Sequence, residues 1–168
     1  TSNTTISPNS VEVLWEDRDG VVTGVTLKEK KVHFMSTGLE GNALIAVKNA
    51  AGKIIWSWHV WVTDQPADHV YVNDRGTFTM LDRNLGAVRA DRGAGEQWRE
   101  SLGLRYQWGR KDPFAENKYK RLGVQLSLDE LILYPTSFII NNGQWIIEQN
   151  HNLWSTSQKT IYDPCPVG

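Results

Sequence analysis

Hydrophobic and polar residues alternate most clearly between Lys53 and Asp64, a segment that holds three tryptophans in twelve residues. Because the side chains of a β-strand point alternately to opposite faces, this segment has one apolar face and one mixed face. The apolar face is formed by Ile54, Trp56, Trp58, Val60 and Val62. We therefore predict a strand whose Trp56, Trp58 and Val60 lie in a hydrophobic core, with its mixed face against solvent or a second layer.

The same three indoles could instead form a flat platform for sugar rings. Tryptophans at alternate positions of a strand are more often core residues, and Trp56 and Trp58 share the apolar face. The core interpretation is therefore favoured. Trp61 lies on the mixed face and is the indole that could contact a neighbouring domain.

Four segments upstream also have the pattern of strands, at residues 11–16, 21–27, 32–35 and 43–48. The links at residues 17–20 and 49–52 are turn-rich and of hairpin length, and each contains a glycine that can adopt positive φ. These strands and turns predict a β-meander or β-sandwich. A polar stretch around Pro66 interrupts the pattern, so we expect one β-rich unit over residues 1–66 and a second unit over residues 67–168.

The second unit mixes strands and helices. Residues 70–72 and 77–81 are predicted strands, and the spacing of Trp98, Leu102 and Tyr106 predicts a helix over residues 95–108. Ser127 and Glu130 form a capping-box pattern, which predicts a short helix that ends before Pro135.

An Asn-Gly turn at residues 142–143 predicts a hairpin between residues 138–140 and 145–147. The fold class expected for the whole chain is mainly β with short helices, an α+β arrangement.

Composition excludes several classes of protein. A net charge of -1 over 168 residues argues against a dedicated nucleic-acid or membrane-surface protein, and no apolar run is long enough for a membrane span. The first ten residues lack a secretion signal, which leaves a cytosolic protein or a processed exported one. Cys165 is the only cysteine, so it has no disulfide partner within the chain.

No catalytic or cofactor site is predicted. The four histidines are dispersed without the spacing of a zinc or iron site, and no nucleophile motif is present. A loop calcium site is a possible alternative, because oxygen ligands are available at Asp82, Asn84, Asp91, Asn150, Asn152 and Asp163. Such residues are more often turn formers. We therefore expect no metal and no other cofactor.

The segment from Arg105 to Arg121 interleaves basic residues with aromatic ones. Aromatic rings and cations together can bind single-stranded nucleic acid or acidic glycans. The favoured interpretation is a helix end followed by a solvated loop, in which the cations interact with the helix dipole.

Three sequence blocks point to a known family. They are Asp82-Arg83-Asn84-Leu85-Gly86-Ala87, the run from Gly103 to Phe114, and Tyr162-Asp163-Pro164-Cys165-Pro166-Val167-Gly168. With them, residues 10–168 resemble surface and fimbrillin-associated proteins of Bacteroidetes that carry the Fibrobacter succinogenes major paralogous domain. The resemblance implies export, often as a lipoprotein, and a place on the cell surface or in a fimbria-like assembly associated with the outer membrane.

The family resemblance implies two further expectations. One is a distant similarity of the second unit to C-type-lectin-like folds. The other is that the domain continues beyond Gly168, because the last block normally leads into further sequence. No catalytic residues are carried over from the family.

We therefore expect a non-enzymatic adhesion module that contacts a glycan or a host surface protein. The residues expected to contact that ligand are Trp108, Arg110, Lys111, Trp145 and Trp154. One alternative is a structural fimbrial subunit that assembles with a neighbouring subunit by strand addition. Another is an enzyme that acts on polysaccharide, which requires a pair of facing carboxylates.

Overall fold

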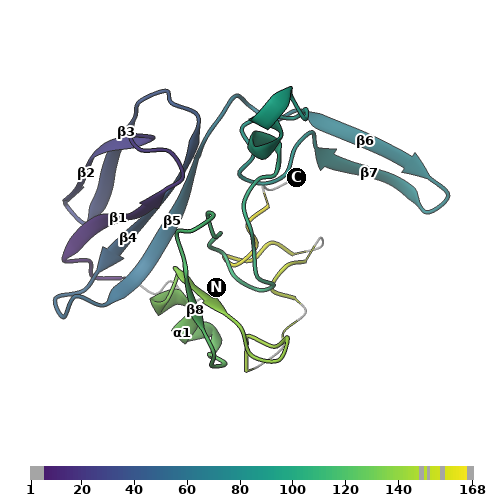
Figure 1. Ribbon diagram of the computed structural model, residues 1–168. Helices are drawn as coiled ribbons and strands as arrows, with labels where there is room; N and C mark the ends of the chain where they lie inside the picture. The colour runs from purple at the N-terminus through teal and green to yellow at the C-terminus, as the bar shows by residue number, and fades with distance from the viewer. Residues whose placement is uncertain (1–5, 148–149, 151, 156–157, 166–168) are drawn as a thin grey trace.

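The computed structural model describes residues 6–147, 150, 152–155 and 158–165, and it is mainly β with short helices (Figure 1). This confirms the prediction of a mainly β chain with short helices. The strands of the first half are β1 (Ser10–Glu16), β2 (Val22–Lys28), β3 (Lys31–Ser36), β4 (Gly41–Lys48), β5 (Ile54–Val62), β6 (Asp68–Asn73) and β7 (Gly76–Leu81). All seven coincide with segments that the sequence predicts as strands.

We keep the names first unit and second unit for the two predicted parts of the chain. The strands of the first unit do not all pair with their neighbours in the chain. β4 lies at the centre of an antiparallel sheet with β1 on one side and β5 on the other, while β2 and β3 form a separate hairpin. A meander would have paired β1 with β2. The central position of β4 fits its sequence, because all residues from Gly41 to Val47 are buried and both faces of this strand are covered.

The two faces of this sheet, defined by the pairs between β4 and β5, contact different parts of the chain. The first face carries pairs such as Ala43 with Val60 and Ile45 with Trp58, and the β2–β3 hairpin packs on it. The second face carries pairs such as Leu44 with His59, and there Leu44 packs against Ala115 of the second unit. The expected second layer on the mixed face is therefore present.

The three predicted core residues of β5 have different environments. Val60 packs against the cluster of buried residues between the sheet and the β2–β3 hairpin. Trp56 is partly buried. Trp58 is 40% exposed, so its expected place in the core is wrong. Trp58 shares the expected face with Val60, but it lines a surface groove together with Val32 and Phe34 of β3.

The second unit begins with the β6–β7 hairpin and continues with short elements. β6 and β7 project from the rest of the chain as an antiparallel pair (Figure 1). The remaining elements are a 3-10 helix, η1 (Gly95–Ser101), β8 (Lys120–Leu122), α1 (Leu128–Leu133) and β9 (Ser137–Ile139). β8 and β9 pair in parallel.

The predicted helix over residues 95–108 is reduced to η1. Gly103 has φ of 70°, a left-handed conformation that ends helical geometry, and Leu104 then donates its backbone N–H to the carbonyl of Leu85. A Cβ at Gly103 would lie 2.5 Å from that same carbonyl oxygen. The close approach of these two backbone segments therefore requires glycine, and it overrides the helical spacing of the side chains.

The capping box is confirmed. The Glu130 backbone N–H donates to Ser127 Oγ, and the Ser127 backbone N–H donates to the Glu130 carboxylate at 2.8 Å. Helix α1 ends at Leu133, before Pro135, as predicted.

The predicted hairpin over residues 138–147 is wrong, although its turn forms. Asn142 and Gly143 both have positive φ, and Gln144 donates its backbone N–H to the carbonyl of Asn141 at 2.8 Å. The flanking segments do not pair with each other, because β9 pairs with β8 and Ile146 forms a parallel bridge with Leu126. Local turn chemistry fixed the turn, and long-range packing fixed the pairing.

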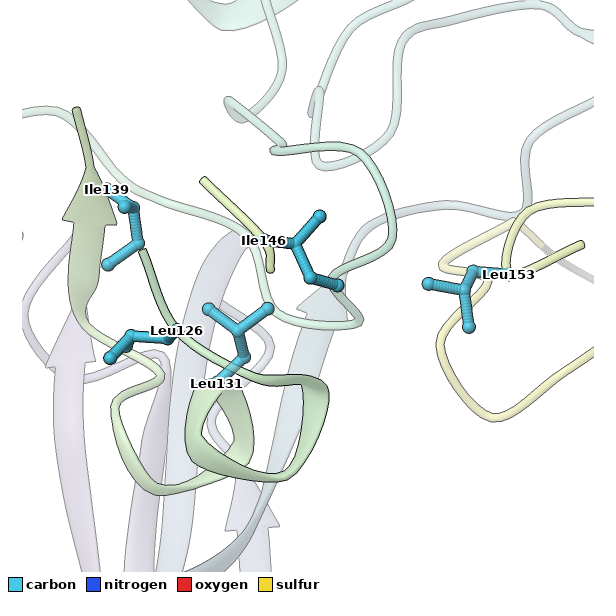
Figure 2. Close-up of a cluster of buried hydrophobic side chains, with 5 residues drawn as sticks. All are labelled: Leu126, Leu131, Ile139, Ile146 and Leu153. Atoms are coloured by element: carbon cyan, nitrogen blue, oxygen red, sulfur yellow. The ribbon is translucent and has the colours of Figure 1, made fainter. Parts of the chain in front are cut away.

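The hydrophobic core of the second unit brings together short segments that are far apart in the chain. Figure 2 shows its five buried side chains, Leu126, Leu131, Ile139, Ile146 and Leu153. Partly buried aromatic residues pack around this cluster, namely Trp145, Trp154 and Tyr162. The core therefore supports the aromatic residues described next.

Candidate binding site

Three of the five predicted ligand residues come together on the second unit. The ring of Trp108 lies 5.1 Å from that of Trp154, with an angle of 52° between the ring planes. Trp145 joins them by donating its indole N–H to the backbone carbonyl of Trp108 at 2.8 Å. We call these three residues the tryptophan cluster. Its members come from three separate segments of the chain.

Trp108 is held at the surface by a tight turn. Arg110 donates its backbone N–H to the carbonyl of Gln107 at 3.0 Å, and Gly109 has φ of 77°, as expected for the third position of a type II turn. A Cβ at Gly109 would lie 2.7 Å from Leu153 Cδ1, so glycine lets the turn sit directly on a core residue. The Trp108 side chain itself is 39% exposed.

The Trp154 indole is held in place by a hydrogen bond and by an aromatic contact. Trp154 donates its indole N–H to the backbone carbonyl of Tyr162 at 2.8 Å, and Tyr106 meets the Trp154 ring edge-on at 6.3 Å. Burial raises the pKa of Tyr106, so its hydroxyl stays protonated at neutral pH. The sequence prediction missed Tyr106 because it was assigned to a helix. Its position two residues before Trp108, on the same side of an extended chain, was the available signal.

The indole N–H groups of the cluster differ in availability. Those of Trp145 and Trp154 are donated to backbone carbonyls. Among the described residues, Trp108 Nε1 has no hydrogen-bond partner. Trp108 therefore offers a partly exposed ring and an N–H donor that no described residue accepts, the two features with which tryptophan binds amphipathic ligands.

Arg110, the fourth predicted ligand residue, is a structural residue. Its side chain donates to the backbone carbonyls of Ser137 at 2.6 Å and Tyr134 at 2.8 Å, and its guanidinium lies 4.9 Å from the centre of the Phe114 ring. Only 3% of the residue is exposed. Burial lowers the pKa of Arg110 to about 10, so it remains charged at neutral pH. This corrects the expectation that Arg110 contacts a ligand.

Lys111, the fifth, is also turned inward. Its ammonium donates to the Ser57 carbonyl at 2.8 Å, to Ser57 Oγ at 2.7 Å and to the Asp112 carboxylate at 2.7 Å, and it lies 4.5 Å from the Trp56 ring. Burial lowers the pKa of Lys111, and the nearby Asp112 charge opposes that effect. Because three acceptors satisfy its three N–H groups, Lys111 joins β5 to the second unit and is not available to a ligand.

A second polar network covers the same face of the sheet. Asn42 donates its side-chain amide to Asp17 at 2.7 Å and to the Gly86 carbonyl at 2.8 Å. Its Oδ1 is left to accept a hydrogen bond from His59 Nε2 at 2.8 Å, which requires the proton on that ring nitrogen. Burial lowers the pKa of His59 to about 4, so the ring is neutral at neutral pH.

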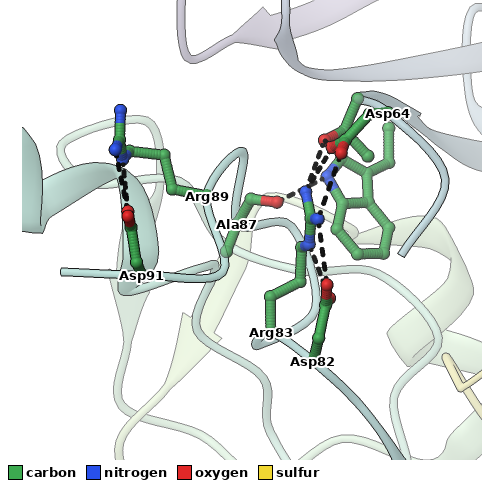
Figure 3. Close-up of polar contacts among 8 residues, drawn as sticks. Asp64, Asp82, Arg83, Ala87, Arg89 and Asp91 are labelled. Carbon is green, nitrogen blue, oxygen red and sulfur yellow. Dashed lines mark hydrogen bonds and ion pairs between the residues drawn. The ribbon is translucent and has the colours of Figure 1, made fainter. Parts of the chain in front are cut away.

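The block from Asp82 to Ala87 is fixed to the end of β5. Figure 3 shows Arg83 between Asp64 and Asp82, with hydrogen bonds to both carboxylates. These bonds raise the pKa of Arg83. In the same region Trp61 donates its indole N–H to the Ala87 carbonyl at 3.2 Å. Trp61 is therefore the indole of β5 that contacts the second unit, as the mixed face suggested.

The carboxylates considered for calcium form ion pairs with neighbouring cations. Asp82 pairs with Arg83, Asp91 with Arg89 (Figure 3), and Asp163 with Lys159. Within residues 6–147, 150, 152–155 and 158–165, no group of three or more His, Cys, Asp or Glu side chains is arranged to hold a metal ion. In that same part of the chain, no helix has the length and apolar character needed to cross a membrane.

Comparisons with protein-family models, with curated proteins and with solved structures each found no match for this chain. The geometry of the tryptophan cluster therefore carries the functional argument.

Proposed function

We propose that the protein is a non-enzymatic, cell-surface or fimbria-associated binding module whose tryptophan cluster contacts a glycan. The observation that carries this proposal is Trp108, which combines an exposed ring with an indole N–H that no described protein atom accepts. Aromatic rings stack against the apolar faces of sugar rings, and an N–H donor can bond a sugar hydroxyl. A protein ligand on a host surface is the alternative partner for the same cluster.

The glycan should be uncharged. The cations that would attract an acidic sugar, Arg110 and Lys111, are both used in internal hydrogen bonds. Binding should therefore depend on stacking and hydrogen bonds more than on charge, and it should change little with salt concentration.

The arrangement of the chain is compatible with a surface adhesin. We infer a β-sandwich-like first unit and a C-type-lectin-like second unit, and the family resemblance supports export to the cell surface. Loops often carry ligand sites on a rigid scaffold, and Trp108 lies in a turn between Gln107 and Arg110.

A glycan array followed by titration of the strongest sugar tests the proposal. Trp108→Ala should weaken binding by about 5- to 150-fold, because one stacked ring contributes on the order of 1 to 3 kcal/mol. This variant keeps the Trp145 hydrogen bond, which uses the backbone carbonyl of Trp108. Trp98→Ala on η1 is the matched control and should bind normally. Absence of sugar binding by the native protein, or equal binding by the Trp108 variant, would reject the glycan proposal.

A second candidate function is that of a structural subunit that assembles by strand addition. It is favoured by a groove of about 340 Å³ in the first unit, lined by apolar residues of β3, β4 and β5. Among the described strands, β3 pairs only with β2, so one of its edges is open. Light scattering should then show polymers that grow with protein concentration, whereas a monomer at all concentrations would reject this candidate.

A further inference from the structure

The β6–β7 hairpin is an exposed surface with several apolar side chains. Among the described strands, β6 and β7 pair only with each other, and every residue from Asp68 to Met80 is exposed. The register places His69 opposite Met80 and Tyr71 opposite Phe78, so these four side chains share one face. A two-stranded hairpin alone is marginally stable in water, and exposed apolar patches usually mark contact surfaces.

The outer edge of β7 has none of the features that usually prevent an exposed strand from pairing with another strand. Proteins usually guard exposed strand edges with charges or proline. β7 runs from Gly76 to Leu81 with the sequence GTFTML, which contains neither. Counting from the Asn73–Gly76 pair that closes the two-residue turn, the Thr79 backbone N–H points away from β6. β7 can therefore accept another strand.

A second unpartnered apolar surface lies at the other end of the molecule. It is the groove of the first unit, whose apolar lining includes Pro8, Val32, Phe34, Ile45, Val47 and Trp58. Figure 1 shows β2 and β3 on the side of the molecule opposite to β6 and β7. Because the two surfaces are so placed, one copy of the chain cannot bring its own hairpin to its own groove.

The two surfaces carry charges of opposite sign. The turn beside the groove holds three lysines and one glutamate at residues 28–31, and Lys30 and Lys31 line the groove. Neither of these two lysines has an ion pair within the described part of the chain. The hairpin contains two acidic residues, Asp68 and Asp74, and one basic residue, Arg75, so its net charge is negative. Opposite charges favour the hairpin of another copy as the occupant of the groove.

We propose that the β6–β7 hairpin of one copy docks into the groove of a second copy, with β7 added to the open edge of β3. This proposal rests on the proposed function of assembly by strand addition, and it identifies β7 as the strand that is added. Hairpin and groove are different surfaces, so the contact is head-to-tail and joins copies into open chains unless a rotation closes them. Each docking event covers the exposed apolar face of one hairpin and the exposed Phe34 and Trp58 of the next copy.

Two single variants and their mixture test this inference. Thr79→Pro removes the outward N–H of β7, and Phe34→Glu places a charge in the groove. Light scattering should show the native protein growing with concentration and each variant alone as a monomer. An equimolar mixture should give a one-to-one complex, because each variant supplies the surface that the other lacks. Phe78→Lys is a second hairpin variant, which changes a side chain and leaves the backbone of β7 intact.

The other outcomes reject the inference in distinguishable ways. A native protein that stays monomeric rejects both the hairpin donor and strand addition. Polymers that persist in Thr79→Pro and Phe78→Lys but vanish in Phe34→Glu would keep strand addition and reject the hairpin as donor. Dimers of Phe34→Glu alone would mean that two hairpins pair with each other, and they would reject the groove as the partner surface.

Discussion

The two faces of the β1–β4–β5 sheet are covered to different extents, and the apolar face is the less completely covered of the two. The apolar face, which carries Trp58, is left partly open because the β2–β3 hairpin does not cover all of it. The polar face is closed by the second unit, which accepts hydrogen bonds from Ser57, Asn42 and Trp61. On this sheet, the apolar face is still free to bind a partner. The polar face already packs against the second unit of the same chain.

This difference follows from the cost of burying polar groups. A polar side chain is buried only when its hydrogen bonds are made, so a fully bonded polar face requires a fixed partner in a fixed position. No buried side-chain N or O atom of the described residues lacks a hydrogen bond. Apolar contacts are less directional and can be completed by different partners. The groove and the β6–β7 hairpin remain open for that reason.

The largest expected effect is on the polar face. Asp112→Ala leaves the Lys111 ammonium buried without its counter-charge, and the free energy of unfolding should fall by about 3 to 5 kcal/mol. Urea unfolding measures this change. Asp91→Ala, which breaks an exposed ion pair with Arg89, is the control and should cost less than about 1 kcal/mol. Equal effects of the two substitutions would contradict the burial of the Lys111–Asp112 pair on this face.

A smaller effect is expected from the protonation of His59. Its folded-state pKa of about 4 lies below the unfolded value of 6.5, so its stabilising contribution is complete above pH 6.5 and is lost as the pH falls toward 4. The free energy of unfolding should drop by about 2 kcal/mol between about pH 7 and pH 5. His59→Gln cannot titrate but can still donate to Asn42, so this loss should disappear. The same slope in both proteins would show that other groups cause it.

The smallest effect is expected on the open face. Trp58→Ala should lower the free energy of unfolding by about 1 to 2 kcal/mol, below the roughly 3 to 5 kcal/mol typical of a buried tryptophan, because the residue is already 40% exposed. Val60→Ala on the same strand packs against the core cluster and is the comparison. A loss of several kcal/mol for the Trp58 variant would mean that the groove is closed in solution.

Sequence reasoning predicted the strands well, because the hydrophobic pattern of a strand and the turn residues that flank it are local features. All seven strands of the first half and helix α1 agree with prediction to within about two residues at each end, a normal uncertainty for element ends. It failed on pairing. The turn at Asn142 and Gly143 is local, but the partners of its flanking segments are set by distant packing against Leu122 and Leu126.

The candidate site was predicted in part for a similar reason. Trp108, Trp145 and Trp154 were identified by residue type, and their convergence depends on a core that no local pattern reveals. Arg110 and Lys111 are hydrophilic in sequence, yet they are buried here. Their acceptors come from distant residues such as Tyr134, Ser137 and Ser57, so sequence spacing gave no sign of their burial.

A double-mutant cycle between Ser57 and Asp112 tests most directly whether the Lys111 region joins the sheet to the second unit. Ser57 Oγ donates to the Asp112 carboxylate at 2.9 Å across 55 positions of sequence, and both residues are buried. With Ser57→Ala, Asp112→Ala and the double variant, urea unfolding should give a coupling energy of about 1 kcal/mol or more. Additivity within about 0.4 kcal/mol would contradict a joined polar face.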